Sequence, residues 1–157
     1  MLVVKSPGPC IIRRVESYIM VSVRPPERLL MSQTATPTAR SHRILLVEDH
    51  GDTREALSKL LTLLGHSVYP AGDADAALGI AAIVKLDLVI SDVGLPGKSG
   101  LSLMAELKRQ YGLKGIAMTG YGSDADVEAC SVAGFSQHLL KPVDMAILAQ
   151  SIEKLFA

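Results

Sequence analysis

The sequence is poor in cysteine and has no long uninterrupted hydrophobic run. Its two cysteines, Cys10 and Cys130, lie far apart in a chain of 157 residues and do not make a disulfide framework. Arginine and glutamate residues interrupt the apolar stretches near the N-terminus, which leaves them too short for a membrane span or a signal-peptide core. These absences argue against secretion and membrane insertion and favour a reducing, cytoplasmic compartment.

The sequence also lacks an excess of basic charge in its larger part. Lysine plus arginine and aspartate plus glutamate both number 16 overall, but residues 41–157 carry 14 acidic against ten basic side chains. A mildly acidic domain does not present the electrostatic surface that binds nucleic acid. We therefore expect no direct contact with nucleic acid.

Length and composition indicate one domain with an N-terminal tail. A chain of 157 residues suits one domain of ordinary size. Residues 32–41 (SQTATPTARS) are small and polar, as in a flexible lead-in. We predict a domain over residues 42–157 and, over residues 1–41, an extension that is either disordered or untranslated. Met31 precedes the polar lead-in, which suggests the hypothesis that translation starts there.

Short apolar runs alternate with amphipathic stretches from residue 43 onward, which is typical of βα units around a parallel sheet. The pattern predicts strands at residues 44–47, 67–69, 86–91, 115–118 and 135–139. It predicts helices following residue 52 and at about 73–84, 100–111, from 123, and 144–156. The first helix is expected to take Asp52 as its N-cap, to end at Gly65, and to present one leucine face made of Leu57, Leu60, Leu61 and Leu64.

Chemically distinctive side chains follow four of the predicted strands. Glu48 and Asp49 come after the first strand, Asp92 after the third, Thr119 after the fourth and Lys141 after the fifth. Ligands bind at the carboxyl edge of such sheets, because the loops converge there. Each residue alone has an ordinary explanation as a cap, turn former or solvated side chain, but their conjunction at one edge predicts a functional pocket.

The residue types predict the chemistry of that pocket. Three acidic side chains at one edge repel one another unless a cation neutralises them. Oxygen ligands, with no cysteine or histidine at these positions, favour Mg²⁺ over zinc or copper. A hydroxyl and an ammonium group suit the oxygens of a phosphoryl group. Together these features predict a carboxylate that receives phosphate.

Four motifs in order show a specific family resemblance: ILLVEDH, LVISDVGLPGKSG, AMTGYG and HLLKPV. Over residues 43–157 the sequence closely resembles the receiver domains of bacterial two-component response regulators. The resemblance implies a flavodoxin-like (βα)5 three-layer α/β sandwich with parallel strand order 2-1-3-4-5. It also implies phosphorelay signalling, with a histidine kinase or phosphotransfer protein as partner and no enzymatic activity beyond the domain's own phosphorylation and dephosphorylation.

The same resemblance assigns roles to the pocket residues. Asp92 is the expected phosphoacceptor, and Mg²⁺ is expected on Asp49, Asp92 and the backbone carbonyl of Gly94, with Glu48 assisting through water. Lys141 is expected to pair with the acceptor and then with the phosphate. Thr119 is expected to move toward the phosphate and act as a switch residue, and the Lys141–Pro142 peptide bond is usually cis in relatives.

Two positions depart from the family pattern. His138 stands where relatives usually carry tyrosine or phenylalanine, so it is either the rotating ring of the switch, with added pH sensitivity, or an exposed histidine on an edge strand. Gly94 stands where relatives often carry a larger side chain, which opens a path for the attacking water, whereas Tyr121 could shield the phosphate. These opposing effects leave the lifetime of the phosphorylated state open.

The sequence ends with the last predicted helix, so we expect output through contacts with an unidentified protein, as a monomer or weak dimer. A relay member that passes phosphate onward is an equally open alternative. A haloacid-dehalogenase-type phosphatase is disfavoured, because its nucleophile follows the first strand and a second aspartate follows two residues later, where this chain has Gly51 and Gly94. A pseudo-receiver is disfavoured because the acidic pair, the acceptor and the lysine are all present.

Overall fold

The computed structural model describes residues 40–157, and the predictions for the extension and for a start at Met31 concern residues that lie mainly outside this range. Five strands and five helices alternate along the described chain. In order they are β1 (Arg43–Val47), α1 (Gly51–Leu63), β2 (Ser67–Ala71), α2 (Ala74–Ile83), β3 (Leu88–Asp92), α3 (Gly100–Tyr111), β4 (Lys114–Thr119), α4 (Asp124–Ala133), β5 (Gln137–Leu140) and α5 (Met145–Phe156).

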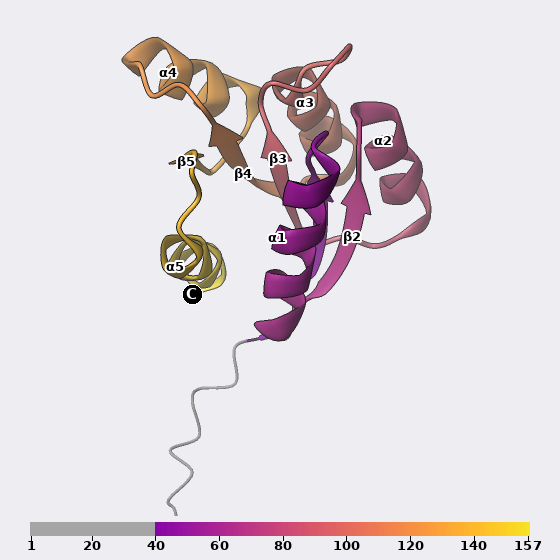
Figure 1. Cartoon of the computed structure of the whole chain (residues 1–157). Helices are drawn as coiled ribbons and strands as arrows, with labels where there is room; N and C mark the ends of the chain where they lie inside the picture. Colours follow the sequence, from indigo (N-terminus) through magenta and orange to yellow (C-terminus); the bar gives the residue numbers. More distant parts are fainter. Residues whose placement is uncertain (1–39) are drawn as a thin grey trace, which may run out of the picture. The chain divides into compact units, whose positions relative to one another are not determined.

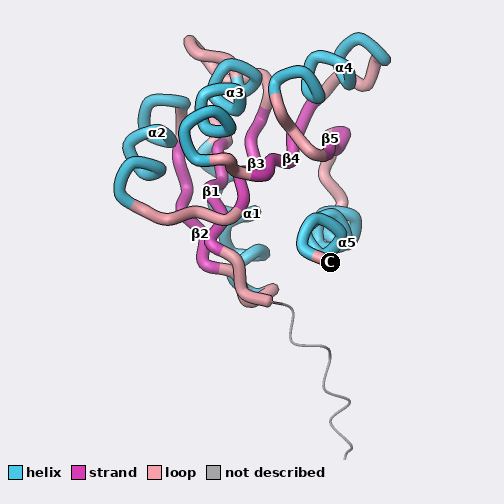
Figure 2. Tube along the Cα trace, turned by 180° about the vertical axis from the view of Figure 1, so that it is seen from behind, coloured by secondary structure: helices cyan, strands magenta, loops and turns pink. Residues whose placement is uncertain are grey.

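The strands form one parallel sheet in the order β2-β1-β3-β4-β5, which confirms the predicted fold class (Figure 1; β1 is labelled in Figure 2). Helices α1 and α5 cover one face of the sheet, and α2, α3 and α4 cover the other, as the reverse view shows (Figure 2). No helix within residues 40–157 is both long and apolar enough to cross a membrane.

Strand β1 shows how the sequence fills both layers of the core. Its side chains from Ile44 to Val47 are completely buried. Ile44 and Leu46 pack in the cluster that includes α1 and α5, whereas Leu45 and Val47 pack in the cluster that includes α2, α3 and α4. Because alternate residues of a strand face opposite sides of a sheet, an all-apolar strand is what a sheet covered on both faces requires.

Local signals begin and end most of the helices at the predicted places. The side chain of Asp73 accepts a hydrogen bond from the backbone N–H of Ala76 at the start of α2, and Ser123 forms a capping box at the start of α4. Gly112 ends α3 in the left-handed conformation, with φ of 65°. These side-chain caps satisfy backbone donors that a helix leaves without partners.

The prediction for the start of α1 is wrong. The helix begins at Gly51, so Asp52 lies inside its first turn and His50 occupies the N-cap position. The side chain of His50 makes no capping bond, because it contacts the preceding acidic residues instead. The predicted leucine face is confirmed in part: Leu57 and Leu61 are buried, whereas two leucines at the edge of the face, Leu60 and Leu64, are each 40% exposed.

The predicted bounds of β3 and β5 also change. Strand β3 begins two residues later than predicted and includes Asp92 as its last residue. Strand β5 begins at Gln137, because the backbone N–H of Phe135 bonds the carbonyl of Cys130 in α4 rather than a neighbouring strand. Phe135 is nevertheless buried, so its apolar character indicated burial and not strand structure.

Candidate functional site

The register of the sheet brings the predicted site residues together at its carboxyl edge. Val47 pairs with Ser91, so Glu48 and Asp92 are the next residues on adjacent strands. Thr119 pairs with Leu140 on β5, so Lys141, the residue after Leu140, lies next to the end of β4. The order in which strands are added to the sheet reverses between β1 and β3: β2 lies beyond β1 on one side, and β4 lies beyond β3 on the other. Crevices form at such switch points in parallel sheets.

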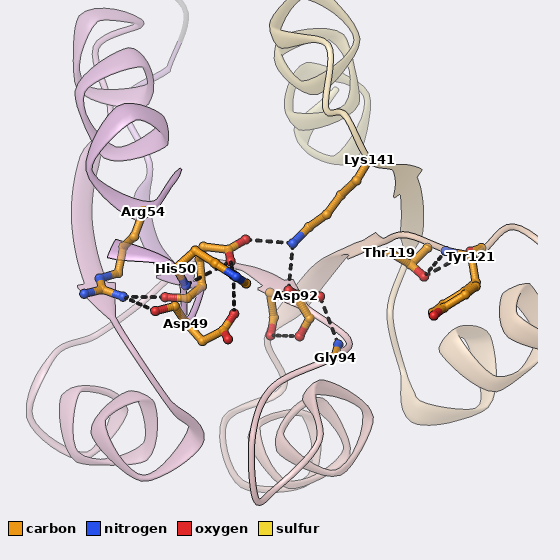
Figure 3. Close-up of polar contacts among 10 residues, drawn as sticks. Asp49, His50, Arg54, Asp92, Gly94, Thr119, Tyr121 and Lys141 are labelled. Atoms are coloured by element: carbon orange, nitrogen blue, oxygen red, sulfur yellow. Dashed lines mark hydrogen bonds and ion pairs between the residues drawn. The ribbon is translucent and has the colours of Figure 1, made fainter. Parts of the chain in front are cut away.

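Lys141 bonds two acidic side chains, one that follows β1 and one at the end of β3 (Figure 3). Its Nζ donates to Oδ2 of Asp92 at 2.7 Å and to Oε2 of Glu48 at 2.9 Å. The Glu48 side chain is completely buried, and that of Asp92 is 11% exposed. Burial acts to lower the pKa of Lys141, but the hydrogen bonds to Asp92 and Glu48 outweigh it and raise this pKa above its ordinary value.

The backbone after β3 also holds the Asp92 carboxylate. The N–H of Gly94 donates to Oδ1 of Asp92 at 2.9 Å (Figure 3), while Lys141 bonds Oδ2. A cavity of about 310 Å³ lies beside this carboxylate, and Gly94, Thr119 and Lys141 are among the residues that line it. The candidate acceptor is therefore fixed through both oxygens and faces a space large enough for a phosphoryl group.

Thr119 lines this cavity, and its backbone carbonyl accepts a hydrogen bond from the Lys141 N–H at 2.8 Å, but among the described residues its hydroxyl bonds neither Asp92 nor Lys141. Its hydroxyl donates to the carbonyl of Tyr121 at 3.0 Å and accepts from the N–H of Tyr121 at 3.0 Å (Figure 3). The hydroxyl thus closes a small ring within the loop after β4. The sequence placed Thr119 in the pocket correctly but gave no indication of this local bond.

His50 joins the acidic pair, which the sequence reasoning overlooked when it found no histidine at the strand ends. Its Nδ1 lies 3.3 Å from Oε1 of Glu48 and 3.1 Å from Oδ1 of Asp49. The hydrogen bond with Glu48 and the charge of Asp49 raise the pKa of His50. Partial burial acts to raise the pKa of Asp49, but the adjacent Glu48 and His50 side chains lower it below its ordinary value.

Arg54 is a second residue that the sequence reasoning missed. Its Nη1 donates to the backbone carbonyls of Glu48 at 2.6 Å and Asp49 at 3.2 Å (Figure 3). Long side chains in helices lean toward the helix N-terminus, so an arginine in the first turn of α1 can reach back over the loop. Its position five residues after Asp49 was the available signal.

The positions expected to hold a cation are only partly drawn together. One ligand atom from each of Glu48, Asp49 and His50 lies within 4.8 Å of the other two, and Asp92 is not a member of this group. Within the described residues both oxygens of Glu48 and both of Asp92 already take part in hydrogen bonds, whereas Asp49 has Oδ2 without one. This donor set is rich in oxygen, as Mg²⁺ prefers.

The two family-specific features differ in what the structure shows. The Lys141–Pro142 peptide bond is cis, as the resemblance implied. His138 is exposed on β5, which is an edge strand of the sheet. This location matches the second of its two predicted descriptions, whereas its part in a switch stays a prediction.

Comparison with known protein families gives a match over residues 44–153 to the response regulator receiver domain. The chain is 39% identical over 114 residues to the response regulator protein FleR of Pseudomonas aeruginosa, covering 71% of this chain and 24% of FleR. It is 29% identical over 146 residues to the sensor histidine kinase RcsC of Escherichia coli, covering 92% of this chain and 15% of RcsC.

Among solved structures, the chemotaxis response regulator CheY4 of Vibrio cholerae is similar in fold, with a TM-score of 0.70 at 24% identity, covering 74% of this chain and 99% of CheY4. The chain thus spans only a minor part of the two long relatives and nearly the whole of the small one. The similarity to FleR and RcsC therefore concerns only part of each of those proteins.

Proposed function

Because the chain belongs to the response regulator receiver family and so takes part in phosphorelay signalling, we propose that it accepts a phosphoryl group on Asp92 from the phosphohistidine of a histidine kinase or phosphotransfer protein. The observation that carries this proposal is the state of the Asp92 carboxylate. It is buried, bonded by Lys141 Nζ at 2.7 Å and by the Gly94 N–H at 2.9 Å, and it borders a cavity of about 310 Å³.

In the proposed transfer, a carboxylate oxygen of Asp92 attacks phosphorus, the P–N bond to the donor histidine breaks, and the released imidazole nitrogen takes up a proton. The product is an acyl phosphate on Asp92. Lys141 has one ammonium hydrogen beyond the two it donates to Glu48 and Asp92, and this hydrogen can bond a phosphoryl oxygen. Pre-placed positive charge of this kind stabilises the charge that develops during phosphoryl transfer.

Receiver domains bind Mg²⁺ at an acidic pocket, and the residues present here fit that ion. We assign Asp49, Asp92 and the backbone carbonyl of Gly94 as direct ligands. Glu48 is buried and already bonded by Lys141 and His50, which supports a role through water. When bound, the ion supplies positive charge that offsets the repulsion among the carboxylates and the incoming phosphoryl oxygens.

The proposed output is a change in protein contacts. Thr119 would leave the Tyr121 carbonyl and bond the phosphate, and His138 on β5 would respond to the movement of this loop. The targets would be a downstream protein or another member of a phosphorelay, contacted in the cytoplasm by a monomer or weak dimer. Catalysis would be limited to phosphorylation and dephosphorylation of the domain itself.

A mass measurement tests this proposal. The full chain is incubated with Mg²⁺ and acetyl phosphate, and its intact mass is recorded together with those of the Asp92→Asn and Asp87→Asn variants. We expect a gain of one phosphate that requires Mg²⁺, is lost in Asp92→Asn, and is retained in Asp87→Asn, because Asp87 precedes β3 at the opposite edge of the sheet.

If no mass gain is seen, a titration with beryllofluoride, which mimics an acyl phosphate, distinguishes rapid hydrolysis from the absence of an acceptor site. Binding that requires Mg²⁺ and is lost in Asp92→Asn would support the acceptor site and indicate rapid hydrolysis. If the protein neither gains mass nor binds beryllofluoride, the proposal is overturned. The domain would then be a folded interaction module that takes no phosphate. A gain that persists in Asp92→Asn would place the acceptor elsewhere.

A further inference from the structure

The guanidinium of Arg54 bonds the backbone of the acidic pair, Glu48 and Asp49, and not their carboxylates. Its Nη1 donates to the carbonyls of both Glu48 and Asp49, at 2.6 and 3.2 Å. The salt bridges found within residues 40–157 do not include Arg54, although Asp52 and Glu55 line the same surface pocket. The side chain is half-buried. An arginine held against two carbonyls, rather than a carboxylate, is fixed by geometry as much as by charge.

These two carbonyls lie just beyond the last residue of strand β1. Strand β1 ends at Val47, and the N–H of Glu48 still donates to the carbonyl of Ala71 at 3.1 Å. Helix α1 begins only at Gly51. Among the hydrogen bonds of the described residues, Arg54 is the donor to both carbonyls in between. It therefore connects α1 to the segment from which the acidic side chains project.

Gly72 gives the guanidinium its space. A Cβ added at Gly72 would lie 3.3 Å from Nη1 and 3.6 Å from Cζ of Arg54, and the three nearest atoms that it would meet all belong to this guanidinium. The backbone of Gly72 is not in the left-handed region, so alanine can adopt its conformation. A substitution there would consequently displace Arg54 without straining the chain.

We propose that Arg54 is a positioning residue for the cation site, and that Gly72 keeps its guanidinium in place. The inference rests on the proposed function, because it concerns the carboxylates assigned to Mg²⁺. Fixing the carbonyls of residues 48 and 49 limits the directions that the two carboxylates can take. Partners that orient metal ligands typically change metal affinity by about 10-fold to 100-fold when they are removed.

The expected effect of Arg54→Met is on Mg²⁺ affinity rather than on the maximal rate. The half-saturating Mg²⁺ concentration for phosphorylation by acetyl phosphate should rise about 10-fold, and the rate at saturating Mg²⁺ should change less than about 2-fold. Arg54→Lys keeps an ammonium that can reach carbonyl oxygens, so it should restore most of the affinity. Acetyl phosphate avoids any effect of Arg54 on kinase docking.

Gly72→Ala provides an independent test through a double-mutant cycle. The added methyl group should shift the guanidinium by a few tenths of an ångström and raise the half-saturating Mg²⁺ concentration by about 3-fold. In the Arg54→Met background, the same substitution should have no further effect, because no guanidinium remains to be displaced. Arg109→Met, on an exposed residue of α3, is the matched control for loss of an arginine.

Direct titration of each full-length variant with Mg²⁺ alone, followed by calorimetry and by the backbone amide signals of residues 48 and 49, gives a readout without phosphorylation. Unchanged Mg²⁺ affinity in Arg54→Met, or a Gly72→Ala effect that is equally large in both backgrounds, would overturn the inference. So would a fall in maximal rate at unchanged Mg²⁺ affinity. Failure of the wild type both to gain phosphate and to bind beryllofluoride would contradict the proposed function instead, while the Mg²⁺ titration would still decide the role of Arg54.

Discussion

Replacing Lys141 by methionine tests whether the bridge between Glu48 and Asp92 stabilises the fold. The substitution keeps an apolar stem of similar length and removes the ammonium that bonds the two carboxylates at 2.9 and 2.7 Å. The Glu48 side chain is completely buried, so its charge cannot be hydrated in place of the lost partner. We expect a loss of stability at neutral pH in the absence of Mg²⁺.

The size of the loss follows from burial. Removing one partner of a fully buried ion pair costs about 3–5 kcal/mol. Lys141 is 29% exposed and Asp92 11% exposed, so water partly screens this pair, and about 2–3 kcal/mol is the better expectation. For a domain of this size, such a loss lowers the melting temperature by roughly 10 °C.

Urea unfolding followed by circular dichroism measures the difference, with Lys154→Met as a control on an exposed lysine of α5. Mg²⁺ should stabilise Lys141→Met more than the wild type, because a cation can replace part of the missing charge. A loss in Lys141→Met no larger than that in the control would refute the reasoning. It would mean that Glu48 and Asp92 tolerate each other without the lysine.

Three further changes test other parts of the domain. Gly100→Ala places a Cβ 2.0 Å from the Asp92 carbonyl oxygen, so it should cost about 3 kcal/mol in urea unfolding, and unchanged stability would contradict this close approach. The hydrogen bond from Arg43 lowers the pKa of Asp87 to about 2; Asp87→Asn should therefore lose about 1 kcal/mol near neutral pH, after allowance for the exposure of this pair, and its difference from the wild type should shrink as the pH falls from about 4 to 2. A difference that stays constant over this interval would argue against the ion pair. Ser123→Ala removes the capping box of α4 and should lower stability by about 1 kcal/mol in thermal unfolding, whereas a gain in stability would show that the cap is unimportant.

The sequence predicted the sheet well, because strands buried on both faces are nearly all apolar and stand out between helical patterns. The sites of Asp92 and Lys141 followed from the same reasoning, since residues that follow parallel strands must meet at one edge. Errors arose where one signal had two meanings. Phe135 is apolar because it is buried, not because it belongs to a strand. Asp52 is a residue type that often caps helices, but it is the second residue of α1.

Contacts that depend on side-chain direction were not predictable from residue type. His50 contacts Glu48 and Asp49 through Nδ1, although its side chain is 75% exposed. Arg54 donates to two backbone carbonyls, which every residue carries, so the sequence shows no pair of opposite charges that would predict these bonds. The bond between Thr119 and the Tyr121 backbone depends on the path of one loop. Each of these is decided by local backbone geometry, which a pattern of apolar and polar residues does not encode.

Under the proposed function, the bond within the loop after β4 would make the response of Thr119 a competition between two acceptors. A hydroxyl has one hydrogen to donate, and in this structure the Tyr121 carbonyl accepts it. A phosphoryl group on Asp92 would offer anionic oxygens in the same cavity, and a charged acceptor binds a hydroxyl more strongly than a neutral carbonyl does. Transfer of that hydrogen bond would break the small ring that closes residues 119–121. Under the proposed function, the loop conformation would therefore be coupled to the chemical state of Asp92 through one hydrogen bond, and the stability of the ring would set how strongly the phosphoryl group must bind Thr119 to open it.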